Sequence, residues 1–185
     1  MKKEYRNSAR TKKMIRSAFV DLIGEKKVIA SISVAEIAER ADIAKSTFYN
    51  HYDDIYAVAD EILRELLGSL DMIIDAMDAD KTSDYHIYIK RIFNFLKENE
   101  DLYRKVSGSP DAIYFIDRIK HIITKRVFAN VKSPFLSKNK TERYVQISFL
   151  ANACVDIMVD YFKGEIDMSF DELEKTIMSI LDKMM

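Results

Sequence analysis

Four polar side chains recur at helical spacing between residues 45 and 50. They stand at relative positions i, i+1, i+4 and i+5, which lie on one face of an α-helix: Lys45, Ser46, Tyr49 and Asn50. Thr47 would lie at the edge of that face. A lysine ammonium and an asparagine amide can hydrogen-bond to the edges of DNA bases, and hydroxyl groups can bond to phosphate oxygens. The spacing therefore indicates a helical surface suited to double-stranded DNA.

The residues before this face predict a second short helix and a sharp turn that would hold the face in place. Ser33, with Glu36 three positions later, forms a capping box that predicts a helix over Val34–Ala41. Asp42 follows, and aspartate accepts the left-handed backbone of a tight turn more readily than most residues. A helix from about Ala44 to Asn50 would leave the turn, which completes a helix-turn-helix arrangement. The side chains expected to hold this arrangement on a core are Val34, Ile37, Ala38, Ile43, Phe48 and Tyr52.

The first 52 residues are basic, although the whole chain carries a formal net charge of −1. They contain eleven basic and six acidic residues, a net charge of +5, which leaves −6 for the remaining 133 residues. The densest run, Lys2 to Arg16, enters a helix expected from about Ser8 to Gly24, with Gly24 as its end. A basic end of this kind suits the DNA backbone, and a solvated tail is the alternative interpretation.

The stretch Ile32–Val58, ISVAEIAERADIAKSTFYNHYDDIYAV, resembles the signature of the TetR family of transcriptional regulators, which reads like TVxDIAxxAGVSKGTLYxHFxSKEEL. The resemblance implies that the helix near Ala44 is the recognition helix. It also implies that Lys45, Thr47, Tyr49 and His51 lie against DNA, and that the N-terminal arm and first helix add phosphate contacts. The expected DNA-binding residues are Lys2, Lys3, Arg6, Arg10, Lys45, Ser46, Thr47, Tyr49, Asn50 and His51.

Two departures from the family pattern bear on this expectation. Asp42 stands where the family usually has the turn glycine, and aspartate is a tolerable replacement for the reason given above. Ile55 stands where many relatives have a lysine, and Asp53 and Asp54 precede it, so we expect one phosphate contact to be lost. The run STFYNHYDDIYAV is also similar to a subgroup that includes regulators of the dihydroxyacetone kinase type.

The rest of the chain predicts further helices, so the expected fold is all-α. Apolar periodicity and capping signals indicate helices over Ile55–Met77, around Ile89–Leu96, over Asp111–Ala129, over Thr141–Lys163, and after a second capping box at Ser169. The TetR-like resemblance then implies about nine helices in two domains. The expected domains are a helix-turn-helix domain, residues 1–53, and a helical effector-binding and dimerisation domain, residues 54–185.

The helix expected over Thr141–Lys163 carries two apolar stripes, which is more than one buried side requires. We therefore expect a two-fold symmetric homodimer, with recognition helices spaced about one DNA turn apart or slightly more. The expected interface residues are Ala153, Ile157, Tyr161, Ile177, Ile180 and Met184.

Aromatic side chains spread over several helices of the second domain fit either a packed core or a cavity for a small-molecule effector. The candidate effector residues are Tyr88, Phe93, Tyr103, Tyr114, Phe115 and Phe149. With such a pocket, the chain would be a dimeric repressor released from a palindromic operator by its effector. The alternative is a DNA-bound coactivator or adaptor whose second domain docks a protein partner.

Composition argues against catalysis, cofactors and metals. The four glycines are too widely spaced for a glycine-rich phosphate loop, and no Cys, His or carboxylate residues cluster at zinc-ligand spacing. A helical enzyme that shares the motif is the weakest alternative. Cys154 is expected to be a small buried apolar residue. Without an apolar leader or a sufficiently long uncharged apolar run, we expect a cytoplasmic protein that does not span a membrane.

Overall fold

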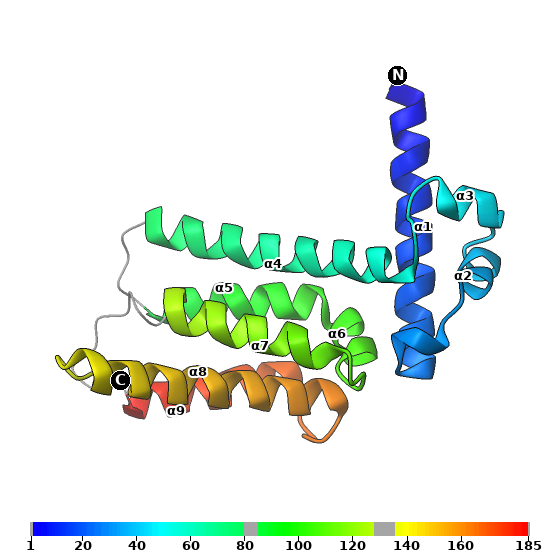
Figure 1. Ribbon diagram of the computed structural model, residues 1–185. Coiled ribbons are helices and arrows are strands. Elements are labelled where there is room, and N and C mark those ends of the chain that lie inside the picture. Colours follow the sequence, from blue (N-terminus) through cyan, green and yellow to red (C-terminus); the bar gives the residue numbers. More distant parts are fainter. Residues whose placement is uncertain (1, 80–84, 128–135, 185) are drawn as a thin grey trace. The chain divides into compact units, whose positions relative to one another are not determined.

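The computed structural model describes residues 2–79, 85–127 and 136–184, and the regular elements in these ranges are all helical (Figure 1). The prediction of an all-α fold is therefore confirmed. The helices group into two compact units. The first contains the residues up to Leu66 together with Arg104–Ile113, and the second contains Leu67–Tyr103 and the residues from Tyr114 onward. The first unit thus includes more of the chain than residues 1–53.

The first unit is built on the long helix α1 (Lys2–Lys26), which the 3-10 turn η1 (Ile29–Ser31) connects to α2 (Val34–Arg40). Helix α3 (Lys45–Tyr49) follows, and α4 (Ile55–Ala79) begins in this unit. Helix α2 contacts both α1 and α3 (Figure 1). The core of these helices consists of Ile15, Ala18, Phe19, Leu22, Ile23, Ile32, Ile37, Ala38, Ala41, Phe48, Tyr52, Val58 and Ile62.

Helix α1 does not end at Gly24, which corrects the expectation from the sequence. It continues to Lys26, and Lys27 then adopts a left-handed backbone with φ of 65°. Gly24 instead lies where α1 closely approaches Lys105. A Cβ atom on Gly24 would come within 3.0 Å of Lys105 Cγ, well inside ordinary van der Waals contact. This glycine therefore allows close packing rather than helix termination.

The second unit contains α5 (Tyr85–Glu98), most of α7 (Ala112–Ile122), the π-helical segment η2 (Ile123–Val127), α8 (Lys140–Lys163) and α9 (Phe170–Met184). Helix α5 contacts α9, and η2 contacts α8. The second capping box is present, because the Ser169 hydroxyl accepts the Glu172 N–H at 3.3 Å while Glu172 accepts the Ser169 N–H at 2.8 Å.

One helix was missed by sequence reasoning. Helix α6 (Glu100–Val106) follows α5 after a break at Asn99, whose side-chain amide donates to the Phe95 carbonyl at 2.8 Å. The Asn99 carbonyl in turn accepts the Tyr103 N–H at 3.1 Å. Asparagine is a residue that competes for backbone hydrogen bonds at helix ends, which explains the break.

Helix α8 is long and apolar enough, by length and composition alone, to cross a bilayer, a property it shares with core helices of soluble proteins. Packing accounts for much of that apolar character. Its buried residues are Ile147, Leu150, Ala151, Val155, Met158, Tyr161 and Phe162. Asp156, on an exposed face, pairs with Lys120 of α7 at 2.6 Å. The helix ends at Gly164, whose φ of 81° is the left-handed conformation common at helix C-termini.

Candidate nucleic-acid interface

The turn between α2 and α3 follows directly from local sequence. Ser33 caps α2 by accepting the Glu36 N–H at 3.3 Å, and the Glu36 carboxylate accepts the Ser33 N–H at 3.0 Å, so the predicted capping box is present. Asp42 has a φ of 51°, the left-handed conformation expected of it. The Ile43 N–H then donates to the Ala38 carbonyl at 2.9 Å, which closes the turn and directs the chain into α3.

Helix α3 has one buried side and one exposed side. Phe48 is fully buried, and its ring lies 5.9 Å from that of Tyr52, which is also buried. The opposite side presents the four residues of the expected face, Lys45, Ser46, Tyr49 and Asn50, all of them exposed. Tyr49 exposes 58% of its surface, while the centre of its ring lies 5.6 Å from that of Phe48 with the two rings nearly perpendicular. This phenol therefore packs against the core and still reaches solvent. Thr47 and His51 are half-buried at the margins of the face.

The basic residues of α1 divide into two groups. Lys12 Nζ lies 2.8 Å from Glu61 Oε2 and 5.1 Å from the centre of the Tyr52 ring. Arg16 is hydrogen-bonded to Glu65, so both side chains join α1 to α4. Arg10 is exposed, in keeping with a contact to DNA. Three further members of the expected DNA-binding set have side chains outside the described part of the structure: Lys2, Lys3 and Arg6.

The pKa values of Tyr52 and its neighbour Glu61 are both shifted from their ordinary values. Burial raises the pKa of Tyr52 to about 12, and the neighbouring Glu61 carboxylate acts in the same direction. Burial also acts to raise the pKa of Glu61, but the hydrogen bond and charge of Lys12 outweigh it, and the net shift is downward. Glu61 is therefore ionised at neutral pH and holds Lys12 beside the end of the helix-turn-helix.

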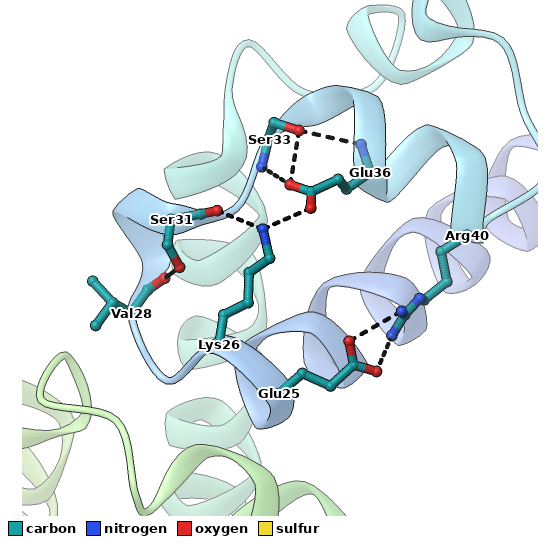
Figure 2. A network of polar contacts seen from close by, with 7 residues as sticks. All are labelled: Glu25, Lys26, Val28, Ser31, Ser33, Glu36 and Arg40. Carbon is teal, nitrogen blue, oxygen red and sulfur yellow. Dashed lines mark hydrogen bonds and ion pairs between the residues drawn. The ribbon is translucent and has the colours of Figure 1, made fainter.

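A second polar network joins α1, η1 and α2, as Figure 2 shows. Lys26 Nζ donates to the Ser31 carbonyl at 2.7 Å and to Glu36 Oε1 at 2.6 Å. The hydrogen bond from Lys26, followed by those from Ser33, lowers the pKa of Glu36 to about 2. Arg40 makes a two-pronged contact with Glu25, which lowers the pKa of Glu25 and raises that of Arg40.

These ion pairs refine the simple charge count. Four of the eleven basic residues in the first 52 positions are paired to carboxylates of the first unit, namely Lys12, Arg16, Lys26 and Arg40. These pairs join α1 to α2 and to α4. Within the described part of the chain, Arg10, Lys13, Lys27 and Lys45 are exposed and make no such ion pair. Lys27 follows the end of α1, whereas Arg10, Lys13 and Lys45 lie on α1 and α3 and are better placed to meet phosphate.

The residues expected to line an effector pocket do not share one environment. Phe93 and Tyr103 are buried in a cluster of rings, Phe93 at 5.6 Å from Phe170 and Tyr103 at 5.1 Å from Phe162. Phe115 is half-buried, and Phe149 exposes 65% of its surface. The side chains of Tyr88 and Tyr114 lie outside the described part of the structure. The first two residues thus contribute to a packed core.

The residues expected at a dimer interface also divide. Ile180 exposes 45% of its surface, and Ala153, Ile157 and Met184 are half-buried. Tyr161 and Ile177, in contrast, are buried within the single chain. Tyr161 is held there because its hydroxyl donates to Glu100 at 3.0 Å and its ring packs on Phe162 and Phe170.

Sequence reasoning missed an exposed apolar group on the first half of α8. Tyr144 and Val145 each expose 61% of their surface, and Phe149 lies one turn further along. The sequence does contain a signal for this group. Val145 and Phe149 are four positions apart, so they share one face of the helix, and that face differs from the buried one that carries Ile147 and Ala151.

Two expectations about reactive chemistry concern other parts of the chain. Among the described residues, no group of three or more His, Cys, Asp or Glu side chains is arranged to hold a metal ion. Burial raises the pKa of the Cys154 thiol to about 11, so the reactive thiolate is scarce at neutral pH.

A basic three-helix unit with a capped helix-turn-helix and a polar, exposed second helix defines a DNA-binding regulator. Comparison with known proteins identifies the family. Residues 83–183, more than half of the chain, match the TetR family described as "Transcriptional regulator C-terminal region". The chain belongs to the TetR family of transcriptional regulators, and the resemblance seen in the sequence is confirmed.

Individual relatives support the same assignment. The chain is 32% identical over 62 residues to the uncharacterized HTH-type transcriptional regulator YxbF of Bacillus subtilis (strain 168). That match covers 34% of this chain and 15% of YxbF, so only a small part of YxbF's length is spanned.

Two solved structures share the fold. A TetR transcriptional regulator from Streptococcus agalactiae 2603V superposes with a TM-score of 0.67 at 20% identity, over 96% of each chain. The dihydroxyacetone kinase operon activator DhaS superposes with a TM-score of 0.62 at 21% identity, over 94% of this chain and 96% of DhaS. The TetR-like fold, with nine α-helices in the described part of this chain, extends over nearly the whole chain.

Proposed function

We propose that this regulator reads a palindromic operator with α3. The observation that carries the proposal is the two-sided character of that helix, in which a fully buried Phe48 fixes an exposed face of Lys45, Ser46, Tyr49 and Asn50. Thr47 and His51 border the face, and side chains on the N-terminal half of α1 contact the phosphate backbone of the DNA. In this proposal, residues 1–53 carry DNA recognition and residues 54–185 carry dimerisation and effector response.

The test is selection of duplexes from a random-sequence library by the full-length protein, followed by binding measurements on the enriched duplex. Tyr49→Phe is expected to weaken binding to all sequences, because it removes a hydroxyl suited to phosphate. Lys45→Ala is expected either to do the same or to relax preference at one base pair. Lys175→Ala, an exposed lysine on α9, is the matched control. Unchanged affinity in both α3 variants would show that α3 is not the recognition helix.

The proposed dimer uses the exposed apolar side chains of α8 and α9. Phe149 and Ile180 expose 65% and 45% of their surfaces, and exposed apolar patches often mark interfaces. Sedimentation is expected to give a species twice the 21.5 kDa of one chain. Phe149→Lys combined with Ile180→Lys should shift it to the single-chain mass with the helical circular-dichroism spectrum retained. A wild-type protein that sediments as a single chain would contradict the dimer.

The proposed regulation is repression relieved by a small molecule. An effector can act only by binding two arrangements of the second unit with different affinity, so that the spacing of the recognition helices changes. A thermal-shift screen with a metabolite library tests this directly. A compound that raises the melting temperature and lowers affinity for the selected duplex would support it, and a screen without such a compound would favour the protein-docking alternative.

The sign of regulation has a second candidate. DhaS is an activator of the dihydroxyacetone kinase operon, and this chain shares its fold. Transcription in vitro from a promoter carrying the selected duplex separates the two. Repression predicts less transcript when the protein is added, whereas an activator of the dihydroxyacetone kinase type predicts more.

A further inference from the structure

The segment Arg104–Ile113 has an unusual place in the chain. It follows and precedes residues of the second unit, yet it belongs to the first unit with the helix-turn-helix. It contains the end of α6, a loop and the start of α7. Ser107, Ser109 and Ala112 within it are buried, which shows that the segment packs against the rest of the protein.

The first anchor of this segment is on α1. Lys105 Nζ lies 2.8 Å from Asp21 Oδ1, and the Lys105 stem lies against Gly24, where a Cβ atom would come within 3.2 Å of Lys105 Cβ. A similar close approach occurs at Gly108, where a Cβ atom would lie 3.3 Å from Lys27 Nζ. The segment therefore lies close to the end of α1 at Gly24 and close to the Lys27 side chain at Gly108.

The second anchor is on η1. Asp111 Oδ2 accepts the Ile29 N–H at 2.8 Å, and the Ser109 hydroxyl orients Asp111 by accepting its backbone N–H at 3.2 Å. Ile29 is the first residue of η1, whose last residue, Ser31, offers its carbonyl to Lys26.

From η1 the polar contacts continue to α2, as the network in Figure 2 shows. Lys26 bridges the Ser31 carbonyl and Glu36, and Glu36 closes the capping box with Ser33 at the start of α2. Helix α2 in turn packs on α3. Asp111 is thus connected through η1 to the helix that supports the DNA-binding face.

We infer that Lys105 and Asp111 are positioning residues for DNA recognition, which set the placement of α2 and α3 through the end of α1 and through η1. The inference rests on the proposed function of α3. Arg104–Ile113 contains the end of α6 and the start of α7, so the proposed positioning contacts lie outside the helix-turn-helix. DNA affinity then depends on residues that touch no DNA.

Thermodynamic linkage between docking of this segment and DNA binding predicts a measurable effect that a purely structural role would not produce. If docking of the segment favours DNA binding, DNA binding must favour docking by the same factor. Hydrogen exchange of the backbone amides in 104–113 should therefore slow when the selected duplex is added, although these residues lie outside α3 and the N-terminal half of α1.

The experiment compares full-length wild type with Asp111→Ala and Lys105→Met, using the duplex selected by the wild-type protein. Each variant is expected to bind about fivefold more weakly or worse, the lower end of common coupling effects. Exchange over 27–36 is expected to rise in Asp111→Ala. Asp111→Asn keeps an acceptor oxygen for the Ile29 N–H and is expected to bind as wild type, and Asp117→Ala, an exposed carboxylate of α7, serves as control.

Three results would overturn the inference: wild-type affinity in both variants, no slowing of exchange in 104–113 on adding DNA, or a rise in exchange spread evenly over the first unit, which would indicate general destabilisation. A wild-type protein that enriches no duplex would instead refute the proposed function, and this inference with it. The two failures are therefore distinguishable.

Discussion

The division of the basic residues into paired and unpaired groups predicts how the DNA affinity of each variant depends on salt. Lys45 is exposed on α3 and, within the described part of the chain, makes no ion pair. Lys26 is held between Glu36 Oε1 at 2.6 Å and the Ser31 carbonyl at 2.7 Å. Only the first is expected to displace counterions from DNA, so Lys45→Ala and Lys26→Ala should behave differently.

The magnitude follows from counterion release. Each phosphate contact contributes about 0.9 to the slope of log affinity against log salt on double-stranded DNA. With two copies of the protein on one operator, Lys45→Ala should therefore reduce the magnitude of this slope by about 1.8. Affinity at moderate salt should fall about tenfold, which corresponds to about 1.4 kcal/mol. Lys26→Ala should leave the slope unchanged.

Fluorescence anisotropy with a labelled copy of the selected duplex, measured between about 50 and 300 mM salt, gives both slopes. Lys13→Ala, on the exposed side of α1, is a useful third variant, and we expect it to reduce the slope by at most one contact per copy. Equal slopes for wild type and Lys45→Ala would refute a phosphate contact by Lys45 and leave the base contact as its proposed role. A reduced slope in Lys26→Ala would show that its ion pair opens on DNA.

Three further predictions concern stability and reactivity. At φ of 51°, Asp42→Gly should match or exceed wild-type stability and Asp42→Val should lose about 1–2 kcal/mol, measured by urea unfolding; equal stability of the two variants would contradict the strain. The hydrogen bond from Lys26 lowers the pKa of Glu36 from 4.5 to about 2, so its stabilising contribution is complete above pH 4.5 and is lost as the pH falls toward 2. The stability difference between wild type and Glu36→Gln should therefore shrink across that window in acid titrations, and a constant difference would count against it. Burial raises the pKa of the half-buried Cys154 to about 11, so a disulfide reagent at about pH 8 should react slowly with the folded protein and quickly after denaturation; rapid reaction of the native thiol would contradict the raised pKa.

Local signals in the sequence were sufficient for the helix-turn-helix. The capping boxes at Ser33 and Ser169 are both present, and Asp42 adopts the backbone conformation that its residue type favours. These features depend on residues within a few positions of one another. The apolar spacing of Phe48 and Tyr52 likewise predicted which side of α3 is buried.

Features that depend on distant partners were not predictable in the same way. Gly24 was expected to end α1, because the partner that requires a glycine there, Lys105, lies 81 positions further along the chain. The pairing of Lys12 with Glu61, 49 positions further along the chain, was not predictable for the same reason. Aromatic residues such as Phe93 could line a cavity or fill a core, and only the three-dimensional arrangement shows that it packs on Phe170.

The most direct test of DNA recognition by α3 is cleavage of the operator from the helix itself. Asn50→Cys, in a Cys154→Ser background, provides a single exposed attachment point for a chelate that generates hydroxyl radicals. With the selected duplex bound, the account predicts cuts within two symmetric half-sites whose centres lie about one helical turn or slightly more apart. Cleavage that is absent, or confined to one side of an asymmetric site, would contradict it.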